Sequence, residues 1–96
     1  MRQITIDAIR AFRNGNKFKR GNTEVKTFPH SPYRELRLHG NAIAELGPHG
    51  LFISSCGYKT VTTKERLNGL PNVHIIQRNF QWFLNGEPWD GQIVKV

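Results

Sequence analysis

The sequence predicts an α+β protein: a small antiparallel β-sheet, arranged as a meander of about five to seven short strands, with an N-terminal helix and a short second helix. Apolar residues recur at helical spacing near the N-terminus, and the period changes to two from residue 22 onward. Gly, Pro and Asn separate the apolar runs. The 96 residues fit one domain, 1–96, since a chain this short supports only one core. We divide it into a basic N-terminal helix and loop (1–20) and a β-rich body (21–96).

The N-terminal helix is predicted from one apolar stripe. Ile6, Ile9 and Phe12 recur every three residues, which places them on one face of a helix. Thr5 is a suitable residue to cap the first amides, and Gly15 suits the left-handed residue that often ends a helix. A helix is therefore expected between these two residues.

The β-rich body is predicted from short alternating segments separated by turn residues. Strands are expected at 22–28, 34–39, 42–46, 51–55, 73–77 and 80–84, with an edge strand at 93–96. Gly40-Asn41 and Arg78-Asn79 are the expected two-residue turns, and Pro29–Pro32 is a rigid break. These segments predict one compact sheet.

A second helix is predicted at 62–69 from a capping pattern. In a capping box Thr62 would accept from the amide of Glu65, and the Glu65 carboxylate would reach back to the amide of Thr62. Gly69 and Pro71 stop this helix, so it is barely two turns long and depends on packing through Leu67 and Leu70.

Cysteine content and hydropathy favour a soluble, cytoplasmic protein. Cys56 is the single cysteine, so no internal disulfide can form. The N-terminus has no apolar run long enough for a signal peptide or for a membrane span.

Charge is the most informative bulk property, and it is unevenly distributed. The chain carries 14 Lys and Arg against 7 Asp and Glu, a net charge of +7. Residues 1–40 hold nine basic and three acidic side chains (+6), whereas residues 41–96 hold five and four (+1). A localised positive potential attracts polyanions or an acidic protein surface.

The candidate binding residues lie in an acid-free run between Asp7 and Glu24. They are Arg10, Arg13, Lys17, Lys19 and Arg20. If the helix extends to residue 17, the first three form a ridge that can follow a phosphate track, and Phe18 can stack on an unpaired base. The alternatives are contact with an acidic protein, or a solvated face that only aids solubility while Phe18 packs inward. A second basic patch is expected from Lys59, Lys64 and Arg66.

Catalytic, metal and cofactor sites are not expected. The four histidines match no ligand motif, and no glycine-rich phosphate loop occurs. Ser54–Gly57 is the only segment worth considering for a nucleophile, and we expect it to mark a strand end, with Cys56 half-buried. The carboxylates mostly lie beside Lys or Arg, as solvated ion partners do. We therefore expect a binding protein and not an enzyme.

The C-terminal aromatic residues offer a second possible surface. Trp82 and Phe83 are neighbours on a predicted strand, so they point to opposite faces and only one enters a one-sided core. Trp89 can fold back from its turn to cover the other ring. Without that cover, an exposed aromatic ring would be an interface anchor.

Two motifs resemble a known protein family. They are TTKERLNGL at 62–70 and WFLNGEPWDG at 82–91, supported by similar stretches at 21–25 and 36–44. With these motifs the chain resembles a family of small proteins encoded by tailed bacteriophages, over roughly residues 21–92. The resemblance implies a viral origin and action in the bacterial cytoplasm, and it carries over no catalytic residues. It leaves the basic residues 1–20 outside the shared region.

Two functions follow as hypotheses. The first is a phage nucleic-acid-binding protein that contacts the phosphate backbone with little sequence preference. The second is an inhibitor that docks on a host protein, such as a defence effector or a transcription component.

Overall fold

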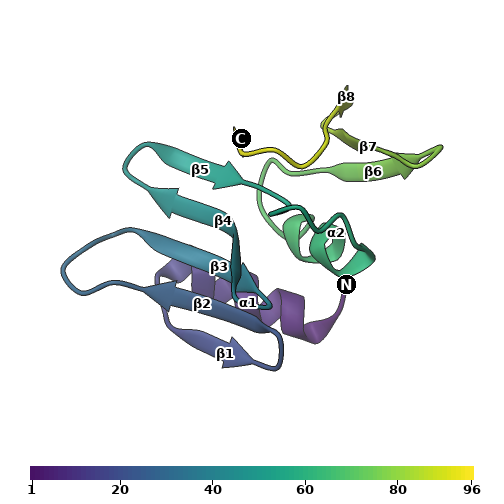
Figure 1. Cartoon of the computed structure of the whole chain (residues 1–96). Helices are drawn as coiled ribbons and strands as arrows, with labels where there is room; N and C mark the ends of the chain where they lie inside the picture. Colours follow the sequence, from purple (N-terminus) through teal and green to yellow (C-terminus); the bar gives the residue numbers. More distant parts are fainter.

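Two helices and nine strands follow one another in the computed structural model, which describes residues 1–96 (Figure 1). The helices are α1 (Gln3–Asn14) and α2 (Val61–Leu67). The strands are β1 (Phe18–Arg20), β2 (Thr23–Thr27), β3 (Arg34–Leu38), β4 (Asn41–Gly47), β5 (Gly50–Ile53), β6 (Ile75–Arg78), β7 (Gln81–Leu84), β8 (Glu87–Pro88) and β9 (Val94–Lys95). The α+β class is confirmed.

The larger sheet is the predicted antiparallel meander, but it gains strand β1 where the basic segment 1–20 was expected to end in a loop. Its six strands have the order β1-β2-β3-β4-β5-β9, so the C-terminal strand closes the β5 edge, as expected for residues 93–96. The registers align one row of apolar side chains across the sheet: Phe18, Val25, Leu36, Ala44, Ile53 and Val94. Helix α1 packs on this face of β1, β2 and β3 (Figure 1).

The expectation of one sheet is wrong, because β6, β7 and β8 form a second, three-stranded sheet. Helix α2 lies between β5 and β6 in the chain, and β9 takes the β5 edge that β6 would otherwise need. The β6–β7 hairpin therefore projects beyond the larger sheet (Figure 1).

Helix α1 buries the predicted stripe only in part. Ile9 and Phe12 are buried and Gly15 ends the helix with φ +72°, whereas Ile6 is exposed. The predicted cap is wrong: the helix begins at Gln3, and Thr5 lies inside it, fully buried.

Arg34 holds the C-terminal end of α1 against the sheet. Its guanidinium donates to the carbonyl oxygens of Phe12 at 2.7 Å and Arg13 at 2.6 Å. Both carbonyls lie in the last turn, and the Phe12 carbonyl also accepts from the Gly15 amide at 3.4 Å. The contact fixes the direction in which the chain leaves α1 toward β1.

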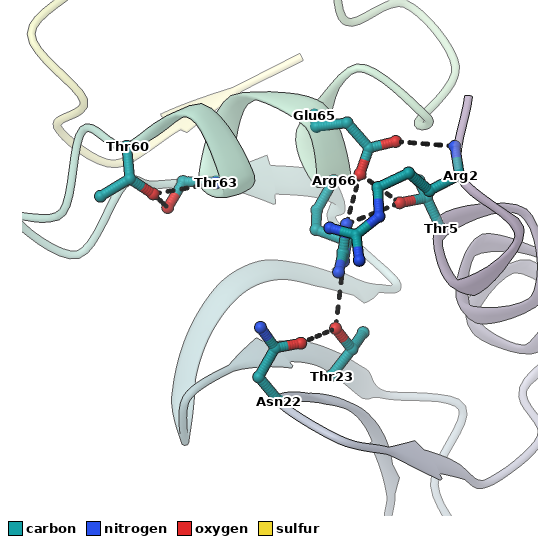
Figure 2. Close-up of polar contacts among 8 residues, drawn as sticks. All are labelled: Arg2, Thr5, Asn22, Thr23, Thr60, Thr63, Glu65 and Arg66. Atoms are coloured by element: carbon teal, nitrogen blue, oxygen red, sulfur yellow. Dashed lines mark hydrogen bonds and ion pairs between the residues drawn. The ribbon is translucent and has the colours of Figure 1, made fainter.

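Helix α2 does not use the predicted capping box. Thr60 is the N-cap, and its Oγ1 accepts from the Thr63 amide at 3.1 Å (Figure 2). Glu65 points instead toward α1, where its carboxylate accepts from the Thr5 hydroxyl and from the Arg2 amide. Leu67 and Leu70 are buried, as expected.

Two hairpin turns lie one residue away from their predicted places. The turn between β3 and β4 is His39-Gly40, and the turn between β6 and β7 is Asn79-Phe80. All four residues have positive φ, which two-residue turns of this kind require.

One core of 16 buried residues joins both helices and both sheets. Trp82 is buried, and Trp89 folds back to pack against it with ring centroids 6.1 Å apart. Phe83, on the opposite face of β7, is half-buried. The fold-back of Trp89 is confirmed, although the ring it covers is Trp82.

Neither α1 nor α2 has the length and apolar character that a membrane-spanning helix needs.

Candidate nucleic-acid interface

The five N-terminal cations do not form one ridge. Helix α1 ends at Asn14, so Lys17 lies beyond it, and the chain then turns into β1, which carries Lys19 and Arg20. Arg10 and Arg13 line one groove, whereas Lys17 and Lys19 line another. The predicted helical ridge is therefore wrong.

Three lysines share a shallow groove at the free edge of the larger sheet. Lys17, Lys19 and Lys26 line this groove of about 450 Å³ along β1 and β2. All three are exposed, and none forms an ion pair. We call these three side chains the lysine groove. Glu24 is the only acid that lines it.

Two acids lie opposite members of the lysine groove, and each also has a cationic neighbour outside it. In the register, Glu24 lies between Lys19 on β1 and Arg37 on β3, and Lys26 lies opposite Glu35. The Glu35 carboxylate forms an ion pair with Arg37 at 2.6 Å. Because Glu35 is paired with Arg37, Lys26 forms no ion pair with a carboxylate.

Around Glu35 the sheet surface is electrically balanced. Tyr33 donates its hydroxyl to Glu35 at 2.7 Å. Burial would raise the pKa of Glu35, but the hydrogen bonds from Tyr33 and Arg37 outweigh it and lower that pKa. Burial and the hydrogen bond to Glu35 raise the pKa of the Tyr33 hydroxyl. This cluster adds no net positive charge.

Arg20 is exposed, and its guanidinium forms contacts with α1 and with Phe18. Its Nη1 forms an ion pair with Asp7 of α1 at 2.8 Å, and its guanidinium lies 5.1 Å from the Phe18 ring centroid. The hydrogen bond from Arg20 lowers the pKa of Asp7. Phe18 is half-buried and packs against the core, as in the alternative reading of this residue. Arg20 therefore has its charge paired with Asp7 although its side chain is 54% exposed.

A second groove lies on the other side of α1. Arg10 and Arg13 line it together with Met1, Ile6 and Gly69, and its volume is about 440 Å³. Met1 is 68% exposed and Ile6 is 37% exposed, so the arginines border apolar surface. No acid lines this groove.

Of the second predicted patch, Arg66 is not a surface residue. It is 1% exposed, and it lies within a polar network between α1, α2 and β2 (Figure 2). Lys59 lies 3.8 Å from Asp90, and Lys64 is half-buried without an ion pair. The patch therefore loses one of its three members to the interior.

The buried network satisfies the Arg66 guanidinium. Its Nε donates to Thr23 Oγ1 at 3.0 Å, and its Nη1 donates to Thr5 Oγ1 at 2.8 Å and to Glu65 (Figure 2). Thr5 donates in turn to Glu65. These contacts make Arg66 a brace between three elements, which explains why it is buried with its charge.

Of the residues considered for catalysis, His49 lines a small pocket of about 140 Å³ together with Glu45 and Tyr33. His39 lines a pocket of about 360 Å³ with threonine and serine hydroxyls, but neither Cys56 nor an acid lines it. Cys56 is half-buried, as expected, and its thiol donates to the Ala42 carbonyl at 3.0 Å. Nowhere do three His, Cys, Asp or Glu side chains come together as potential metal ligands.

Two surface residues were missed from the sequence. Lys26 joins the lysine groove because the alternation of β2 turns it away from the buried Thr23 and Val25. That alternation was a usable signal. Phe80 was expected within a strand, but it lies in the turn and is 94% exposed.

The comparisons with known proteins identify one family. A family model described as Kyanoviridae Gp96 protein matches residues 1–95. The match includes the basic N-terminal residues, so the expectation that residues 1–20 lie outside the shared region is wrong. Neither a curated protein nor a solved structure matches the chain.

Proposed function

The chain belongs to the Kyanoviridae Gp96 protein family of phages, and we propose that it is a non-catalytic binding protein that contacts nucleic acid through the lysine groove. We further propose that it acts in the cytoplasm of the bacterial host, because phages reproduce inside the host cell.

The unpaired lysines carry this proposal. Lys17, Lys19 and Lys26 border one groove at the sheet edge, and no carboxylate neutralises any of them through an ion pair. Lysine is a compact, mobile point charge that suits phosphate contact without base recognition. The rest of the chain adds to a net charge of +7, which favours approach to a polyanion.

The contacts are expected to be electrostatic and to have little sequence preference. Each phosphate engaged on duplex DNA contributes about 0.9 to the slope of log affinity against log salt. Three lysines therefore give a slope of about −2.7 if each engages one phosphate. Arg10, Arg13 and the other exposed cations can steepen it.

Fluorescence anisotropy with a labelled DNA duplex at several salt concentrations tests the lysine groove. The triple variant Lys17→Ala, Lys19→Ala, Lys26→Ala is expected to reduce the slope by about 2.7 and to weaken binding at every salt concentration. A matched control, Lys59→Ala, Lys64→Ala, Lys95→Ala, removes the same charge elsewhere. Comparison of the two triple variants separates a local binding site from general electrostatic attraction. Equal losses in both triple variants, or no loss in the first, would contradict the proposal.

A host-protein inhibitor is the second candidate, and the Arg10–Arg13 groove favours it. Two arginines beside the exposed Met1 and Ile6 suit an acidic segment that also carries apolar side chains. A pull-down from host lysate, with and without nuclease, separates the two functions. A stoichiometric protein that survives nuclease and is lost with Arg10→Glu, Arg13→Glu supports the inhibitor. Loss of all partners after nuclease supports nucleic-acid binding.

A further inference from the structure

The tip of the β6–β7 hairpin presents an aromatic ring to solvent. Arg78 and Gln81 form the last pair of the hairpin, and Asn79 and Phe80 make the two-residue turn between them. Phe80 is 94% exposed, more than any other large apolar side chain of the chain. The ring therefore makes almost no contribution to the core.

Phenylalanine is an unfavourable residue for this turn. Asn79 has φ +52° and Phe80 has φ +67°, both in the left-handed region. Asparagine tolerates that region, and glycine is preferred after it, whereas a bulky side chain is strained there. Phe80 thus combines backbone strain with a ring that packs on nothing, which points to a role outside the fold.

The surroundings of the ring are polar and cationic. No acid occurs between Glu65 and Glu87 in the sequence, a stretch that contains the whole hairpin. Arg78 is exposed, with its guanidinium 6.0 Å from the Phe83 ring centroid. Asp90 accepts a hydrogen bond from Gln81 at 3.2 Å, and its carboxylate also lies 3.8 Å from Lys59.

We propose that this hairpin tip binds single-stranded nucleic acid, with an unpaired base stacked on Phe80 and a neighbouring phosphate held by Arg78. The proposal rests on the proposed function and specifies the form of nucleic acid. Bases of a duplex are already stacked, so only an unpaired base can cover the face of the ring. Amide and guanidinium groups beside the ring suit base edges and phosphates, whereas a protein pocket would favour apolar neighbours.

Anisotropy with a labelled single strand and with its duplex tests this proposal. Phe80→Ala is expected to weaken single-strand binding about 5- to 100-fold, since stacking on an aromatic ring has that effect per base. Duplex affinity should stay within about twofold. Phe80→Trp should retain single-strand affinity, and its added fluorescence should be quenched on binding. Equal single-strand affinity of the wild type and Phe80→Ala would overturn the proposal.

Thermal unfolding of Phe80→Gly shows whether the ring serves the fold. Because glycine relieves the left-handed strain at this position, the variant should unfold at the same or a higher temperature while losing single-strand affinity. A lower unfolding temperature would assign Phe80 a structural role and overturn the proposal.

The outcomes distinguish this inference from the function on which it rests. If only the lysine-groove variant weakens binding, the function stands and the role of Phe80 is rejected. If only Phe80→Ala weakens binding, the hairpin is the site and the groove is rejected. No binding to either form by the wild type rejects both. Loss of a nuclease-resistant protein partner in Phe80→Ala, with nucleic-acid affinity unchanged, assigns the ring to protein docking and overturns the inference.

Discussion

Substitution of Arg66 by alanine removes the centre of the buried polar network. The guanidinium is 1% exposed and joins α2 to Thr5 on α1 and Thr23 on β2. Alanine keeps the backbone of α2 but removes every one of these contacts, together with the buried stem of the side chain. The variant therefore measures how much of the stability depends on this brace.

The partners that remain set the size of the expected loss. Removal of one partner of a buried ion pair costs about 3–5 kcal/mol. Glu65 keeps 23% side-chain exposure, so water can solvate its charge in the variant. Thr5 still donates to Glu65, and Thr23 still donates to Asn22 at 2.8 Å. The loss should thus lie near the lower limit, at about 3 kcal/mol.

Urea and thermal unfolding, followed by circular dichroism, measure this loss. About 3 kcal/mol corresponds to a fall of about 12–24 °C in Tm for a domain of this size. Arg66→Met, which keeps most of the side-chain volume, should lose less than Arg66→Ala. Lys64→Ala on the same helix is the matched control and should change stability by less than about 0.5 kcal/mol. A loss below about 1 kcal/mol for Arg66→Ala would refute the role of the brace.

Two further predictions concern the contacts of α1. Gly69→Ala should destabilise the fold by about 1–3 kcal/mol in urea unfolding. The reason is that a Cβ at this position would lie 2.8 Å from Ile9 Cγ1 and 3.0 Å from Thr5 Cγ2. Stability equal to that of the wild type would contradict this close approach. The hydrogen bond from Arg20 lowers the pKa of Asp7 in the folded state. The ion pair therefore stabilises the fold above the unfolded-state pKa, which is about 3.9. This contribution disappears as the pH falls through the lower folded-state pKa. Asp7→Asn should therefore be less stable than the wild type at pH 7 and similar at pH 2, and a constant difference across that range would argue against the ion pair.

The sequence alone determined the local elements of this protein. The apolar stripe through Ile9 and Phe12 and the ending at Gly15 predicted α1 without its cap. Alternation predicted β2, β3, β4 and β5 within one or two residues of their ends. These signals succeed because helical period, alternation and turn residues act over a few neighbouring positions.

The candidate site was predicted less well than the fold. Lys17 and Lys19 line one groove, Arg10 and Arg13 line a different one, and Arg20 is paired with Asp7. The direction of a cation depends on where the helix stops and how the chain turns back. A one-residue change in a turn has the same effect at Phe80, which leaves a strand and enters solvent.

Only the tertiary structure decided which distant segments meet. Glu65 accepts from Thr5, 60 residues away, and its neighbour Arg66 contacts Thr23 and becomes buried. Similarly, β9 pairs with β5 and leaves β6 to a second sheet. A charged side chain enters a core only where its partners already lie, and a strand pairs only with an edge that is free. Both conditions depend on the assembled fold, so no local pattern in the sequence reports them.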